Sequence, residues 1–176
     1  MYFFAKILKK FFKIFNSAAL PWQIFVGVLL GTLLGFLPVF PLNHGPALLG
    51  CAILMVALVI NCHLTAVLLF FGIGKLLSYA LAGPAVMIGD SLDSVAQACA
   101  DIPFLHASLW SHTGWLGLTI LGFCFAPLFA IAMWRLTVLF RVKLRDRLMA
   151  RKQLVTAGKV GGNMILVRIV CWFFDI

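Results

Sequence analysis

Residues 20–82 form a long apolar stretch that prolines interrupt, and this stretch limits what the chain can fold into. It holds a single charged side chain, Lys75, and three prolines near its middle. A proline inside a helix removes one backbone hydrogen bond and its ring clashes with the preceding turn, so the first helix should end near Pro38. A water-soluble fold would not hide such a break within apolar sequence. The stretch therefore indicates a membrane protein.

The composition points the same way. Of the 176 residues, 64% are hydrophobic and only 11% are charged, whereas soluble domains are about 45–50% apolar. The fold class we expect is all-α: a polytopic membrane protein with short or re-entrant helices in its N-terminal half and flanking amphipathic interfacial helices.

Three glycines precede the prolines at intervals of four residues. Gly27, Gly31 and Gly35 would share one face of a helix, and small residues at such spacing let another backbone approach closely. We predict that this face is a helix-packing surface. A chain this small has little interior of its own, so we expect a second copy of the chain, or another membrane or envelope protein, to cover it.

The charges are segregated along the chain. Four lysines lie near the N-terminus and eight basic residues lie from Arg135 to Lys159, whereas residues 84–113 contain three aspartates and no Lys or Arg. By the positive-inside rule, both termini should be cytoplasmic and the acidic segment should lie outside. The basic residues expected to contact anionic lipid headgroups are Lys6, Lys9, Lys10, Lys13, Arg141, Lys143 and Arg145. Nucleic acid is not an expected partner of the net charge of +9, because the basic residues flank apolar segments without a soluble module to carry them.

These patterns divide the chain into five parts. We expect an amphipathic interfacial helix at 1–16, a Gly/Pro-rich membrane module at 20–82, an outer acidic loop at 83–113, a transmembrane helix at 114–140, and a basic cytoplasmic and interfacial tail at 141–176. Within the acidic loop, residues 86–100 should form one short surface helix.

The number of crossings in residues 20–82 is a question of parity. A cytoplasmic N-terminus and an outer acidic loop require an odd number of crossings, yet the helix before Pro38 is shorter than the roughly 20 residues that span a bilayer. Three short, tilted crossings satisfy this requirement. So does a re-entrant hairpin over residues 21–60, with its tip at the prolines, followed by one true crossing.

Polar residues accompany the breaks in the apolar stretch. One interpretation is that they line a polar cavity at a re-entrant turn. The other is that the Asn and His side chains satisfy backbone groups at helix ends. The residues concerned are Pro38, Pro41, Asn43, His44, Pro46, Asn61 and His63. Lys75 could extend outward from the end of its helix, or pair with a lipid phosphate or with the region of Asp90.

Catalytic and metal-binding patterns are not evident. The chain contains no Glu, and its aspartates lie away from the Gly/Pro centre, so we expect neither an enzyme nor a cofactor. The five cysteines lack C-x-x-C spacing and suit small apolar positions, and no set of Cys and His has the spacing of a zinc site.

Residues 21–89 carry a family resemblance. The string PWQIFVGVLLGTLLGFLP, a short turn with Gly45, an apolar helix ending at Asn61, and a second run ending in Gly74-Lys75 resemble a widespread bacterial family of small inner-membrane proteins with a domain of unknown function. That family shares a G-x-x-x-G-x-x-P core followed by an Asn after an apolar helix. The resemblance implies a bacterial inner membrane and no established activity.

Two hypotheses for function follow. The first is a non-enzymatic inner-membrane subunit or partner of a cell-envelope complex, with a role in lipid transfer. The alternative is a small transporter or lipid scramblase, with a polar path at the re-entrant Pro/Asn/His turn.

Overall fold

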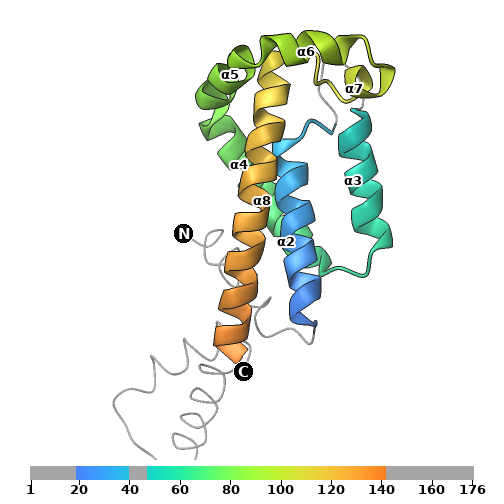
Figure 1. Ribbon diagram of the computed structural model, residues 1–176. Coiled ribbons are helices and arrows are strands. Elements are labelled where there is room, and N and C mark those ends of the chain that lie inside the picture. Colours follow the sequence, from blue (N-terminus) through green and yellow to red (C-terminus); the bar gives the residue numbers. More distant parts are fainter. Residues whose placement is uncertain (1–18, 40–46, 142–176) are drawn as a thin grey trace, which may run out of the picture.

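The structure is a computed structural model that describes residues 19–39 and 47–141, and the described residues are helical or lie in short connections. The all-α class is therefore confirmed. Four of the described helices run along the length of the molecule (Figure 1). Three shorter helices cross one end, and we call these three helices the cap. The long helices are α2 (Pro21–Phe36), α3 (Leu48–Val59), α4 (Leu64–Ala80) and α8 (Thr113–Leu139); the cap helices are α5 (Ala82–Ser91), α6 (Asp93–Ala100) and α7 (Pro103–Ala107).

Helix α2 begins and ends where its sequence dictates. Pro21 occupies the first turn, where its missing N–H has no intrahelical acceptor to lose, and the Gln23 side chain accepts a hydrogen bond of 2.9 Å from the Leu20 amide. The helix ends at Phe36 because the residue before Pro38 is forced into an extended conformation, with ψ of 147° at Leu37. The predicted break at Pro38 is confirmed.

The glycine face of α2 packs directly against α4. A Cβ built on Gly27 would lie 2.9 Å from the His63 carbonyl oxygen, and one on Gly35 would lie 2.7 Å from the Cα of Gly74. At Gly31 a Cβ would overlap the Val67 carbonyl oxygen. The two backbones therefore touch at three successive glycines, over roughly two turns of α2. This corrects the expectation that another chain covers the face, because α4 of the same chain already occupies it.

Two further glycine contacts place α8. Gly89 of α5 lies against the backbone of Thr113, and Gly117 of α8 lies against the backbone of Ala85, so α5 and α8 also touch backbone to backbone. Lower on α8, a Cβ at Gly122 would lie 2.8 Å from the Cβ of Phe36. Helix α8 is the one that the sequence predicts at 114–140, and it continues through Pro127.

Side chains of α2, α4 and α8 fill the space between these helices. Ile24 and Val28 of α2 are fully buried in one cluster with Phe70 of α4 and Met133 of α8. The rings of Phe36 and Phe125 stack with centroids 5.9 Å apart, which ties the upper halves of α2 and α8 together. Three buried threonines each donate to the carbonyl four residues earlier, so their hydroxyls have partners within their own helices: Thr32, Thr119 and Thr137.

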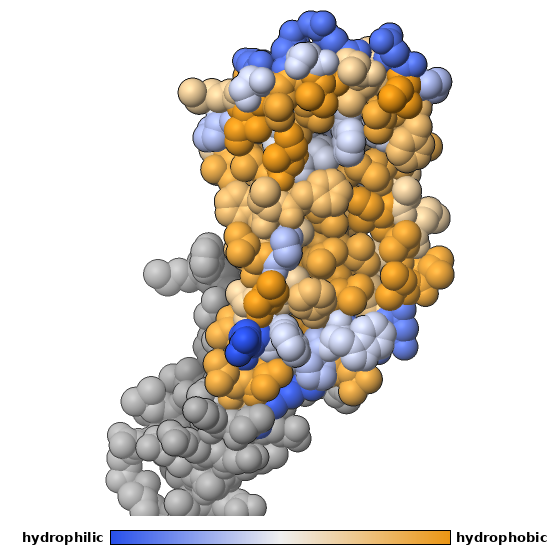
Figure 2. All heavy atoms as spheres, viewed as in Figure 1, coloured by the Kyte–Doolittle hydropathy of each residue, from blue (hydrophilic) through white to orange (hydrophobic). Residues whose placement is uncertain are grey.

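The outer surface is largely apolar between the two ends. Figure 2 shows a broad hydrophobic band, with hydrophilic atoms gathered at the top over the cap and near the bottom. Helix α3 contributes strongly to this band, because only Gly50 and Ala57 of its twelve residues are buried, whereas Val59 is 84% exposed. Apolar patches this large are unusual on a soluble monomer.

Helix length sets which elements could cross a membrane. Helix α8 has 27 residues and is long and apolar enough to span; α4 and α5 pass the same test only together, bent by 70° where they meet. Helices α2 and α3 have 16 and 12 residues, or about 24 and 18 Å at about 1.5 Å per residue.

The acidic region, in which one short helix was expected, is helical over most of its length. Residues 82–107 form the cap, and the single helix predicted at 86–100 is two helices that meet at Leu92. Pro103 begins α7. The predicted interfacial helix at 1–16 and the tail from residue 142 onward lie outside the described residues.

Candidate functional site

The residues predicted to line a polar path do not all meet. Pro38 is buried at the end of α2 nearest the cap, whereas Asn61 and His63 follow the far end of α3. A helix of twelve residues separates the two breaks, a distance of about 18 Å at about 1.5 Å per residue. Pro41, Asn43, His44 and Pro46 lie outside the described residues. Pro38 therefore does not share one polar lining with Asn61 and His63, and the part of the prediction that concerns the turn at 41–46 stays a prediction.

His63 has a structural role at the start of α4. Its Nδ1 accepts a hydrogen bond of 3.2 Å from the Ala66 amide, and its own amide donates to the Gln23 carbonyl at 3.1 Å. Burial lowers the pKa of His63, and the charge of Arg141 lowers it further, against a backbone hydrogen bond that raises it. The neutral ring is the form that can accept from Ala66. His63 thus satisfies backbone groups at a helix end, as one of the two interpretations has it.

Arg141 joins two segments of the chain at the end of the molecule where His63 lies. Its Nη2 donates to the Ala19 carbonyl at 2.7 Å and so joins the end of α8 to the residues before α2. The guanidinium expected at a lipid headgroup therefore makes a contact within the chain. The other predicted headgroup residues lie outside the described residues: Lys6, Lys9, Lys10, Lys13, Lys143 and Arg145.

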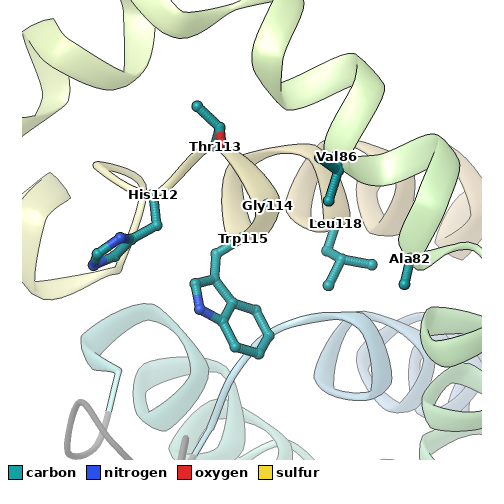
Figure 3. A pocket seen from close by; sticks show the side chains of 7 residues that line it. All are labelled: Ala82, Val86, His112, Thr113, Gly114, Trp115 and Leu118. Atoms are coloured by element: carbon teal, nitrogen blue, oxygen red, sulfur yellow. The ribbon is translucent and has the colours of Figure 1, made fainter.

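A pocket of about 410 Å³ lies at the opposite end, between α5 and the first turns of α8. In Figure 3 the Trp115, Leu118 and Ala82 side chains extend to the same side of the two helices, and His112 lies at the beginning of α8. The lining combines apolar and polar groups: Ala82, Val86, His112, Thr113, Gly114, Trp115 and Leu118.

The turn that leads into this pocket is strained. Leu109 has φ of 63°, in the left-handed region that side chains other than glycine rarely adopt. Next to it, Trp110 Nε1 and Ser111 Oγ are buried without a hydrogen-bond partner among the described residues. Strain and unpaired polar atoms are costly, and they tend to gather at functional sites.

The pocket offers binding chemistry. Val86 and Leu118 supply apolar surface, His112 and Thr113 supply hydrogen-bonding groups, and the first amides of α8 have no intrahelical acceptors. Such a lining suits an amphiphile whose polar part lies near the helix start. Within the described residues no group of three His, Cys or Asp side chains could hold a metal ion.

Sequence reasoning located only part of this pocket. The sequence predicts that Trp110, His112 and Trp115 lie in an outer headgroup layer, because aromatic rings with a polar edge are favoured there. The other lining residues, Ala82, Val86 and Leu118, are ordinary apolar residues. The one available signal is the pair Gly89 and Gly117, which marks close helix contact without saying which helices meet.

Comparisons with protein-family models, with curated proteins and with solved structures found no match for this chain. The resemblance of residues 21–89 to a family of small inner-membrane proteins therefore stays a prediction.

Proposed function

We propose that this chain is an integral protein of the bacterial inner membrane that crosses it more than once and acts without catalysis, as a lipid-handling subunit or partner of a cell-envelope complex. The observation that carries the proposal is the apolar band between two polar ends (Figure 2). Asp90, Asp93 and Asp101 lie in or beside the cap, whereas Arg135 and Arg141 lie at the opposite end of α8. The positive-inside rule then puts the cap outside and both termini in the cytoplasm.

The helix lengths favour a re-entrant arrangement of α2 and α3. At about 24 and 18 Å, both fall short of the roughly 30 Å of a hydrocarbon core. We propose that they enter from the cytoplasmic side and return to it, that α4 then crosses to the cap, and that α8 crosses back. This gives the odd number of crossings that the charges require before the cap.

Cysteine labelling in intact cells tests this topology. An impermeant maleimide should label Asp93→Cys in the cap and should not label Arg135→Cys, with the unsubstituted protein as the control for the native cysteines. Val39→Cys, at the tip of the hairpin, should stay unlabelled. Labelling of Val39→Cys from outside would instead favour three tilted crossings, and labelling of Arg135→Cys would refute the orientation.

The cap-side pocket supports a role with lipid. In the proposed orientation it lies at the level where headgroups meet acyl chains, and its apolar and polar groups match those two parts of a lipid. A Cβ at Gly114 would lie 3.8 Å from Val86, so a larger side chain there should enter the pocket without striking the backbone.

Gly114→Leu is the variant that tests the pocket. We expect it to lower the phospholipid that co-purifies with the protein in mild detergent, measured by lipid mass spectrometry. Gly72→Leu is the matched control, because nothing lies within 4 Å of a Cβ at Gly72. Equal lipid in the two variants would refute a lipid role for the pocket.

A partner chain would have to use other surfaces than the glycine face, which α4 covers. A second copy of this chain or another envelope protein could bind the cap or the exposed face of α3. Identification of the proteins that co-purify with the tagged chain in mild detergent tests the complex; a lone monomer with no partner would count against a subunit role.

The transporter or scramblase hypothesis has less support. Its polar path required the two breaks in residues 20–82 to face each other, and α3 separates them.

A further inference from the structure

Lys75 is a charged residue within an otherwise apolar helix. It is the only charged residue between positions 20 and 82, and it lies in α4, five residues before that helix ends at Ala80. Its Cα is therefore about 7.5 Å below the bend into α5, at about 1.5 Å of rise per residue. The residue is partly buried.

The backbone of Lys75 forms contacts within the described part of the chain, whereas its ammonium group forms none there. The carbonyl accepts a hydrogen bond of 2.8 Å from the Ser78 hydroxyl, and the amide nitrogen lies where a Cβ on Gly35 would be 2.8 Å away. Among the residues that the structure describes, no side chain forms an ion pair or a hydrogen bond with the ammonium. An ammonium left in apolar surroundings without an anion is costly, so an anion from elsewhere would stabilise it.

The chain itself has few anions to offer. It contains five aspartates and no Glu. Asp90 and Asp101 are exposed in or beside the cap, and Asp93 accepts a hydrogen bond of 2.7 Å from Gln97. The other two, Asp146 and Asp175, follow the basic end of α8 in the sequence. A partner for Lys75 is therefore best sought outside the chain.

The position of Lys75 selects the kind of anion. A lysine has a flexible four-carbon stem that can lie along apolar surface while its ammonium extends toward the membrane boundary. From Lys75 the nearer boundary is the bend between α4 and α5, where the cap begins (Figure 1). In the proposed orientation, phospholipid phosphates lie at that level.

We propose that Lys75 binds the phosphate of a phospholipid in the cap-side leaflet, and so fixes one lipid against α4 below the bend. The proposal rests on the membrane insertion proposed above. The proposal adds a lipid site on α4 that is separate from the pocket between α5 and α8. This site would lie in the leaflet on the cap side, opposite the leaflet that contains the basic end of the molecule.

Thermal unfolding of the purified protein in detergent tests the site. A lipid that binds only the folded state raises the unfolding temperature, and the rise reports its affinity. The probes are phosphatidylglycerol, diacylglycerol with the same acyl chains, and inorganic phosphate. The variants are Lys75→Met, which keeps an apolar stem, Lys75→Arg, which keeps the charge, and Arg135→Met, which removes a positive charge from the far end of α8.

We expect phosphatidylglycerol to stabilise the unsubstituted protein, Lys75→Arg and Arg135→Met, and to bind Lys75→Met at least tenfold more weakly. Diacylglycerol should not distinguish the variants. Equal responses of Lys75→Met and the unsubstituted protein to phosphatidylglycerol would overturn the proposal. So would inorganic phosphate acting as well as the lipid, or Lys75→Met losing a co-purifying protein rather than a lipid. If labelling at Asp93→Cys shows insertion, such results refute the Lys75 site alone.

Discussion

A single methyl group at Gly31 should separate the two helices on which the fold depends. A Cβ there would overlap the Val67 carbonyl oxygen and lie 2.9 Å from the Cα of Val67, whereas ordinary contact begins near 3.4 Å, so α4 would have to move by at least roughly half an ångström. The atoms in the way are backbone, which cannot turn aside as a side chain can. A gap of about 0.5–1 Å forfeits about a quarter to a half of each dispersion contact along the interface.

The expected cost follows from these contacts. Overpacking of this kind typically costs about 1–3 kcal/mol, and the better helix propensity of Ala returns up to about 1 kcal/mol. Gly72→Ala on α4 is the matched control, because it gains the same propensity and its Cβ meets nothing within 4 Å. The two variants should therefore differ by about 1–3 kcal/mol, or roughly 2–12 °C in unfolding temperature for a chain of this size.

Thermal unfolding in one detergent, followed by the loss of helical circular dichroism, measures this difference. Size-exclusion chromatography of the same samples adds a second readout. If the glycine face bound another chain, Gly31→Ala would change the size of the complex and leave the unfolding of the monomer unchanged. A Gly31→Ala protein as stable as Gly72→Ala would refute the intramolecular packing argument.

Three other predictions concern the ends of the molecule. Gly117→Ala should destabilise the contact between α5 and α8, because its Cβ would overlap the Ala85 carbonyl oxygen. Gly83→Ala should leave this contact unchanged, since its Cβ meets nothing within 4 Å. The rates at which a protease cuts the cap in the two variants measure the difference. His63→Ala should cost about 1 kcal/mol by removing the cap of α4, and His63→Asn should restore most of it, as unfolding at pH 8 would show. Folding lowers the pKa of His63, so the contribution of its neutral ring to stability should be full above the ordinary histidine pKa of about 6.5 and should fall as the pH drops below that value. If stability depended on pH in the same way in His63→Asn as in the unsubstituted protein, this prediction would be contradicted.

The sequence predicts local features of this fold well because they depend on short-range chemistry. Pro38 ends α2 through a clash with its immediate neighbour, and the apolar run before Arg141 is long enough to predict α8. The acidic segment was harder to predict. Its polar residues indicated one short surface helix at 86–100, whereas two helices, α5 and α6, form there, and they bury Ala85 and Ala96.

The glycine face shows why long-range packing is harder. Four-residue spacing predicts that a backbone will approach Gly27, Gly31 and Gly35, but the same spacing serves a helix of the same chain or of another. The complementary pattern lies on α4, where Ala66 packs against Gly27 and Gly74 packs against Gly35. Two small residues eight positions apart in an apolar run are too weak a pattern to identify α4 as the partner from the sequence.

The polar breaks illustrate a further limit. Both breaks interrupt apolar sequence, and one interpretation was that they line one cavity. In a hairpin of two antiparallel helices, however, the turn between the helices lies at one end and the end of the second helix lies at the other. Because α3 leads away from Pro38 before the chain reaches Asn61, the two breaks lie at opposite ends of α3. The hydrogen bonds from His63 to Gln23 and from Arg141 to Ala19 therefore hold the basic end together, while the lipid binding proposed on the cap side rests, within the described residues, on Lys75 and the pocket beside Trp115.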